Sequence, residues 1–162
     1  MPDESPNPPA AAGPSFKFDA KRWSQTDRIV AIATLVLFIS LFLAWFGAGN
    51  AIYNVTVDGL WHGYMYITLI VSLAILGYLA LVAGMDKLPF KLPVSHAQLL
   101  LVGTALNLLL TVISFLTKPS GTSWEYGAYI GLIAAVIAAA PRIIPAVQAR
   151  FATKRGTPTP SG

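Results

Sequence analysis

The chain has 162 residues, of which 55% are hydrophobic and only 11% charged, and its mean hydropathy is +0.62. Because soluble domains carry about 25% charged residues, this composition predicts an integral membrane protein. The net charge of +4 does not indicate nucleic-acid binding, since the charges lie at the ends of apolar runs. Cysteine is absent, which excludes a disulfide framework, a thiol nucleophile and a thiolate metal site.

The chain opens on a segment rich in Pro and Ser, and we expect residues 1–22 to form a disordered cytoplasmic tail. A charge-free gap from Arg28 to Asp58 follows, and we place the first membrane-spanning helix near 27–48. Ser24 and Asp27 have the spacing of a capping box at its start. A cleaved signal peptide is the alternative, but the apolar run exceeds the usual core of 7–15 residues, which favours a retained span.

Between the first and second spans the sequence "YNVTV" alternates and is followed by the turn signal "DG", which is compatible with a short hairpin. The second charge-free gap, from Asp58 to Asp86, predicts a helix near 62–84. The loop that follows contains the small repeat "KLPF" and "KLPV", whose prolines rule out a continuous helix. We interpret it as a short basic loop that fixes topology, the alternative being an extended segment dipping into the interface.

Two further gaps predict helices near 95–117 and 123–143, again with capping-box spacing at Ser95 to Gln98 and Thr122 to Glu125. Pro141 and Pro145 indicate a kink, and "RIIPAVQARF" indicates an amphipathic turn or two on the membrane surface. The expected fold is an all-α integral membrane four-helix bundle over 23–145. We expect a basic, largely disordered cytoplasmic tail over 146–162.

The basic residues indicate the orientation. Lys and Arg lie before the first span, between the second and third, and after the fourth, and Lys118 alone lies on the other side. The positive-inside rule then places both termini in the cytoplasm of a cell membrane. Tryptophans and basic residues near the span ends are the expected interfacial anchors: Trp23, Trp45, Trp61, Trp124, Lys87, Lys91 and Arg142.

Catalytic and metal-binding patterns are not found. His62 and His96 lie at opposite ends of predicted spans, too far apart to share a metal or haem, and we interpret them as solvated or capping residues. The predicted cores contain no Asp, Glu, Lys or Arg, which argues against a pump or a proton-coupled transporter. We therefore expect no enzyme activity, no catalytic residue, no cofactor and no metal.

Two patterns inside the spans indicate helix contacts. Thr104, Asn107, Thr111 and Ser114 recur on one helical face, which we interpret as an interhelical hydrogen-bonding seam, with the floor of a lipid or quinone pocket as the alternative. Small residues form stripes in the fourth span, at Gly127, Gly131, Ala135 and Ala139, and in the second, at Gly77, Ala80 and Gly84. Such stripes let helices approach closely, either within one chain or between chains.

The stretches "LFLAWFG" and "YGAYIGLIAA" resemble a group of uncharacterised small four-span membrane proteins of actinobacteria, which usually have a proline at the position of Ala44. The resemblance implies a cytoplasmic-membrane location and four spans, and it brings no activity. From the residues we expect a non-catalytic scaffold or accessory subunit. Its partners are the lipid bilayer and other membrane subunits or copies of itself. The alternative is a small homo-oligomeric transporter or channel for a neutral or lipidic solute.

Overall fold

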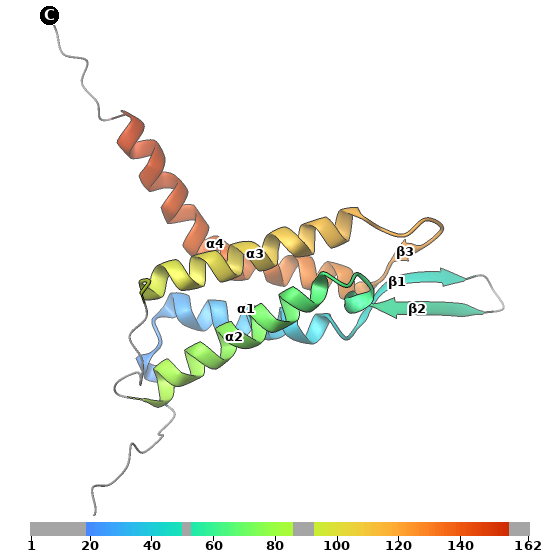
Figure 1. The fold of residues 1–162 in the computed structure, drawn as a ribbon, viewed down its shortest axis with the longest axis horizontal. Helices are drawn as coiled ribbons and strands as arrows, with labels where there is room; N and C mark the ends of the chain where they lie inside the picture. The colour runs from blue at the N-terminus through green and yellow to red at the C-terminus, as the bar shows by residue number, and fades with distance from the viewer. Residues whose placement is uncertain (1–18, 50–52, 86–92, 156–162) are drawn as a thin grey trace, which may run out of the picture.

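The computed structural model describes residues 19–49, 53–85 and 93–155 (Figure 1). Four helices dominate it: α1 (Gln25–Ser40), α2 (Met65–Gly84), α3 (His96–Leu116) and α4 (Tyr126–Arg155). A three-stranded antiparallel sheet with the order β2-β1-β3 covers one end, built from β1 (Ala44–Gly49), β2 (Asn54–Asp58) and β3 (Ser123–Trp124). Short 3-10 turns lie at Ala20–Arg22 and Gly59–Trp61. The prediction of an all-α fold is therefore wrong in this one respect.

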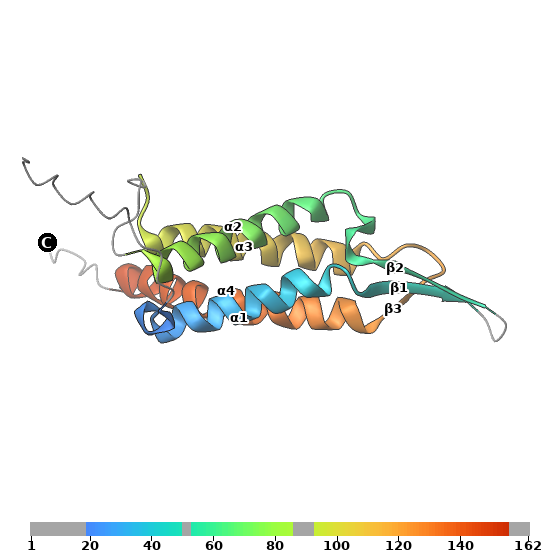
Figure 2. The same ribbon diagram turned by 90° about the horizontal axis from the view of Figure 1, so that it is seen from below.

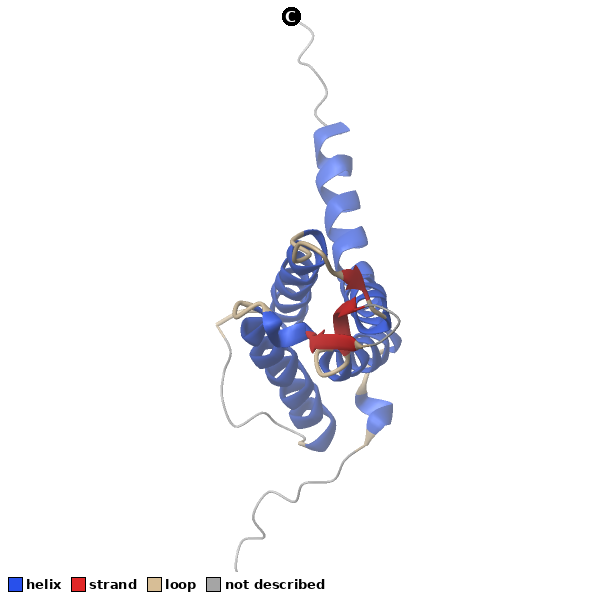
Figure 3. Ribbon diagram, turned by 90° about the vertical axis from the view of Figure 1, so that its right-hand side faces the viewer, coloured by secondary structure: helices blue, strands red, loops and turns tan. Residues whose placement is uncertain are grey.

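The helices form a bundle in which α1 packs against α2 and α4, and α3 packs against the same two neighbours. Figures 2 and 3 show the α2–α3 pair lying beside the α1–α4 pair, with the sheet continuing the bundle at one end. We call this the sheet end, and the opposite end, where α1 begins, the Asp27 end. Because α1 and α3 sit on a diagonal, side chains buried on both of them point toward the interior of the bundle.

In the described part of the chain, three helices have the length and apolar composition of membrane-spanning segments: Met65–Gly84, His96–Leu116 and the Tyr126–Phe151 part of α4. Helix α1 has 16 residues and is about 24 Å long, which is shorter than a hydrocarbon core of about 30 Å. The three apolar helices support a membrane-embedded protein. Their length, rather than that of α1, matches the thickness of a hydrocarbon core.

The first helix ends at Ser40, so the predicted helix over 27–48 is too long. Near its end the bonds shorten to the i−3 pattern, with Phe42 N donating to Ile39 O at 3.1 Å and Leu43 N donating to Ser40 O at 3.1 Å. The Trp45 indole Nε1 donates to the same Ser40 carbonyl at 2.7 Å. The carbonyl that would continue the helix is thus taken, and glycines at 47 and 49 disfavour further helix where the strand follows.

The structure contains the predicted hairpin, but it is larger than the sequence indicated. Strand β2 contains the alternating "NVTV" segment, and it pairs with β1 from Ala44↔Asp58 to Gly49↔Asn54, with a bulge between Ala44 and Phe46. Strand β3 pairs with the other edge of β1 at Phe46↔Trp124 and Gly47↔Ser123. The strand from 44 to 49 lies in the stretch that we had assigned to the first helix.

Helix starts follow the capping chemistry at two of three predicted places. Ser24 with Asp27, and Ser95 with Gln98, form complete capping boxes. The third box is wrong, because the Thr122 hydroxyl donates to Pro119 O at 2.8 Å and α4 begins only at Tyr126. Helix α2 likewise begins at Met65, after the 3-10 turn, rather than at 62.

Helix α4 continues through Pro141 and Pro145 to Arg155, well beyond the predicted end at 143. The first ten residues of the predicted C-terminal tail, 146–155, are therefore helical. Residues 1–18 and 156–162, expected to be disordered, lie outside the described residues, as do Lys87 and Lys91 of the basic loop.

Candidate functional site

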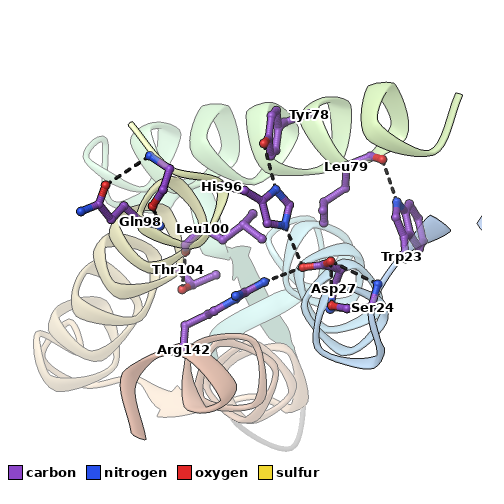
Figure 4. Close-up of polar contacts among 11 residues, drawn as sticks. Trp23, Ser24, Asp27, Tyr78, Leu79, His96, Gln98, Leu100, Thr104 and Arg142 are labelled. Atoms are coloured by element: carbon purple, nitrogen blue, oxygen red, sulfur yellow. Dashed lines mark hydrogen bonds and ion pairs between the residues drawn. The ribbon is translucent and has the colours of Figure 1, made fainter. Parts of the chain in front are cut away.

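The most connected group of side chains in the structure lies at the Asp27 end and joins all four helices (Figure 4). Asp27 comes from the first turn of α1, Tyr78 from α2, His96 from the first turn of α3 and Arg142 from α4. We call these four residues the Asp27 cluster. The capping boxes that start α1 and α3 place Asp27 and His96 at the same level of the bundle, and Tyr78 and Arg142 reach this level from within α2 and α4.

The Asp27 carboxylate is the centre of the cluster. Its Oδ1 accepts hydrogen bonds from Arg142 Nη2 at 2.5 Å and from His96 Nε2 at 3.0 Å. Its Oδ2 accepts from the backbone N of Ser24 at 3.2 Å and from the Ser24 hydroxyl at 2.7 Å. A carboxylate offers about four lone-pair positions, so Asp27 is fully engaged and has none left to take a proton from a substrate.

The partners of His96 determine which of its ring nitrogens donates to Asp27. Its Nε2 faces a carboxylate that can only accept, so Nε2 carries a hydrogen and donates. In the neutral ring Nδ1 is then the acceptor, and the Tyr78 hydroxyl donates to it at 2.9 Å. Four residues on four helices therefore form one continuous hydrogen-bonded chain from Tyr78 to Arg142.

The ion pair between Asp27 and Arg142 is largely buried, so breaking it should cost more stability than breaking a pair on the surface. The Asp27 side chain is 9% exposed and that of Arg142 is 17% exposed. A buried charge needs a partner, because the loss of its hydration is not otherwise repaid. Arg142 was predicted to be an interfacial anchor, which stays a prediction; in the structure its guanidinium turns into the bundle and binds Asp27.

A second polar group lies deeper in the bundle and contains the predicted polar face of α3. Thr104, Asn107, Thr111 and Ser114 are all buried, at 2% exposure or less. Asn107 Nδ2 donates to the Ser72 hydroxyl of α2 at 3.0 Å, which is an interhelical bond of the predicted kind. Thr104 instead donates to the carbonyl of Leu100 in its own helix at 2.7 Å.

Among the residues that the structure describes, three buried polar atoms in this region have no hydrogen-bond partner: Thr34 Oγ1 of α1, and Asn107 Oδ1 and Thr111 Oγ1 of α3. Counting about 1.5 Å per residue from the level of Asp27 and His96, Thr34 lies about 10 Å and Asn107 about 16 Å into the bundle. Unpartnered polar atoms at this depth are costly in a dry interior. They lie in an interior that also contains the hydrophobic clusters around Leu79, Trp45 and Leu37.

The polar seam continues to the sheet end. Ser114 bonds His62 Nδ1 at 3.2 Å, and the Tyr64 and Thr117 hydroxyls are 2.9 Å apart. Both histidines therefore bind side chains of other helices, and the prediction that they are merely solvated or capping is wrong. Phe46 lies edge-on to the His62 ring at 5.6 Å between centroids and helps to close this end.

The small residues of α4 pack inside the chain. Gly127, Gly131, Ala135 and Ala139 are all buried. A Cβ on Gly131 would lie 2.6 Å from Trp45 Cζ2 and 2.8 Å from Ser40 Oγ, and one on Gly127 would lie 2.5 Å from the Ala44 carbonyl. The stripe thus makes room for the end of α1 and for the Trp45 side chain of the same chain.

The stripe of α2 behaves differently. Gly84 is buried, but Gly77 is exposed and a Cβ there would meet nothing within 4 Å. In this structure Gly77 is therefore not a packing residue within the chain.

The predicted tryptophan anchors divide into three kinds. Trp45 is fully buried, so its assignment as an anchor is wrong. Trp23 is half-buried against α2 and donates to Leu79 O at 2.8 Å. Trp61 is 62% exposed, and Trp124 is 39% exposed with its ring stacked on Phe115 and its Nε1 bonded to Phe115 O at 3.0 Å.

An apolar groove of about 420 Å³ runs along the outer side of α1 and α4. Ala33 and Ala134, each about 5% exposed or less, form its floor. Branched residues with exposures of 36–64% form its walls: Ile29, Ile32, Val36, Ile130, Ile133 and Ile137. The groove could not be predicted from the sequence, because its shape depends on which faces of α1 and α4 meet.

Sequence reasoning also missed the Asp27 cluster. It treated Asp27 only as a capping residue, His96 as a helix-start residue and Arg142 as an anchor. One signal was present: Asp27 and Arg142 carry opposite charges at span ends on the same predicted side of the membrane. What the sequence could not supply was the neighbour relation between α1 and α4.

Within the residues that the structure describes, no three His, Asp or Glu side chains gather in a group that could hold a metal ion. No protein-family model, no curated protein and no solved structure matches the chain. The resemblance to small actinobacterial four-span proteins accordingly stays a prediction.

Proposed function

We propose that this protein is a non-catalytic scaffold or accessory subunit of a membrane complex, with the α1–α4 groove as its contact face. In this account the bundle crosses the membrane and the Asp27 end faces the cytoplasm. Lys21, Arg22, Arg28, Arg142 and Arg150 lie at that end, whereas Lys118 lies near the sheet. This distribution supports the orientation through the positive-inside rule.

The groove is the observation that carries the proposal. Its floor of two alanines and its walls of β-branched side chains have the shape that receives the ridge of another helix. Its lining has no polar side chain, so its occupant at this depth is apolar. We assign it one membrane-spanning helix of a partner subunit, held by close packing rather than by charge.

The state of the polar groups agrees with a structural role. Asp27 has all its acceptor positions filled, and Arg142 and His96 are held by it. Such a cluster stabilises one arrangement of four helices, which is what a docking surface requires.

Position-specific crosslinking tests the groove directly, because the chain has no native cysteine. Ile32→Cys and Ile133→Cys place a thiol on each wall, and Ile70→Cys, on an α2 side chain that is 63% exposed, is the matched control. We expect both groove positions to crosslink in the host membrane to the same second polypeptide, and Ile70→Cys not to do so. Equal crosslinking at all three positions, or adducts only between copies of this chain, would contradict the proposal.

A second function is favoured by a different observation. The unpartnered Thr34, Asn107 and Thr111 oxygens support a path for a small neutral solute through the interior. In that case Asn107→Leu abolishes uptake into proteoliposomes while the protein still purifies as the wild type does. Absence of uptake by the wild-type protein would remove this candidate.

A further inference from the structure

The last turns of α4 leave the bundle. Figures 1 and 3 show this segment crossing the long axis of the bundle at a steep angle and projecting well beyond the other helices. Pro141 and Pro145 explain the change of direction, because each lacks the backbone N–H and its ring crowds the carbonyl four residues before. If the bundle stands along the membrane normal, this segment runs toward the plane of the membrane.

The described part of the chain leaves an apolar stripe exposed along this segment. Ile144, Val147 and Phe151 follow one another at steps of three and four, and they are 53%, 44% and 63% exposed. The same face, traced backwards along the helix, carries Ile133 and Ile137 on the outer side of the bundle. The stripe of Ile144, Val147 and Phe151 is thus exposed on a segment that leaves the bundle.

The basic charge of this segment indicates the kind of membrane surface that it would bind. From Tyr126 to Gly162 the sequence has four basic residues, Arg142, Arg150, Lys154 and Arg155, and no acidic one. Arg142 is committed to Asp27, but the Arg150 side chain is exposed. An apolar stripe flanked by basic residues is the pattern of a helix that lies on an anionic membrane surface.

We propose that the part of α4 from Ile144 onward is an interfacial helix that binds anionic lipid headgroups at the Asp27 end. Ile144, Val147 and Phe151 enter the boundary between headgroups and acyl chains. Arg150 stays at the level of the phosphates. This inference uses only the part of α4 beyond the α1–α4 groove, since Ile144, Val147 and Phe151 do not line that groove.

The test places a single environment-sensitive thiol label on the full chain. Val147→Cys reports from the apolar stripe and leaves Phe151 in place, whereas Ala149→Cys lies on the opposite side of the helix and is the matched control. Each variant is reconstituted in vesicles of phosphatidylcholine alone and of phosphatidylcholine mixed with phosphatidylglycerol. Quenching of the label by acrylamide measures its exposure to water.

We expect the anionic vesicles to reduce quenching at Val147 by at least about twofold, since one basic residue near an anionic surface is worth about fivefold in binding. Quenching at Ala149 should not change. Arg150→Gln in the Val147→Cys chain should restore part of the quenching. Equal protection at both positions would indicate a protein contact instead and would overturn the proposal, as would protection that does not depend on lipid charge.

Discussion

Asp27 and Arg142, 115 positions apart in the sequence, form a 2.5 Å ion pair that ties the start of α1 to α4 at the Asp27 end of the bundle. The same carboxylate oxygen also accepts from His96, so one atom connects three helices. With the bond from Tyr78 to His96, the cluster joins all four helices at this end of the bundle.

Removing the carboxylate should be costly. Asp27→Asn leaves the Arg142 guanidinium buried without its counter-charge, and we expect a loss on the order of 3 kcal/mol in the free energy of unfolding. Unfolding in mixed detergent micelles, followed by circular dichroism, measures this change. Asp19→Asn is the control, because Asp19 is exposed. A loss that is no greater than that of the control would contradict a structural role for the pair.

The Tyr78 hydroxyl should contribute through His96 alone. Tyr78→Phe removes the donor to His96 Nδ1 and should lower stability by about 1 kcal/mol. In the Asp27→Asn background the same change should have a smaller effect, since the two groups belong to one hydrogen-bonded chain. Additive effects in this double-mutant cycle would show that the chain is not coupled.

Gly131 and Gly77, which belong to the small-residue stripes of α4 and α2, should respond in opposite ways to substitution by alanine. Gly131→Ala brings a methyl group within 2.6 Å of Trp45 and should destabilise by about 1–3 kcal/mol, as overpacked cores do. Gly77→Ala meets nothing within 4 Å and should be neutral or stabilise α2 by up to about 1 kcal/mol. Thermal unfolding of both variants in one detergent gives the comparison. A stable Gly131→Ala protein would mean that α4 does not approach Trp45 this closely.

The hydrogen bond between Asn107 and Ser72 should contribute little to the free energy of unfolding. Interhelical bonds in membranes average about 0.6 kcal/mol, so Ser72→Ala should lower stability by less than about 2 kcal/mol. A much larger loss would indicate that Ser72 also organises the unpartnered oxygens of Thr34 and Thr111, for example through internal water.

Local rules explain what the sequence predicted well. The charge-free gaps found four helices, and the capping boxes at Ser24 and Ser95 start helices where expected. The face of Thr104, Asn107, Thr111 and Ser114 follows from helical periodicity alone, and the structure buries all four. Each of these inferences needs only residues within a few turns of one another.

The failures involve residues distant in the sequence. The first helix was predicted to extend to 48 because the apolar composition continues. In the structure Trp45 Nε1 and Leu43 N donate to the Ser40 carbonyl, and the helix ends there. Strand β1 follows and pairs with β2 and β3. Trp45 was placed at the interface because tryptophan prefers it, although Gly127 and Gly131 open a site for its ring in the core. The roles of Arg142 and His96 depend on which helices are neighbours, which no local pattern encodes.

The proposed role as an accessory subunit is tested most directly by native mass spectrometry of the chain, gently extracted from its own host membrane. The account predicts a species heavier than 17.3 kDa that contains a second polypeptide, and its loss when Ile32→Ala and Ile133→Ala remove both walls of the groove. The matched pair Ile70→Ala and Leu109→Ala, on exposed positions of α2 and α3, should retain the complex. Detection of only the 17.3 kDa chain or its integral multiples would contradict the account.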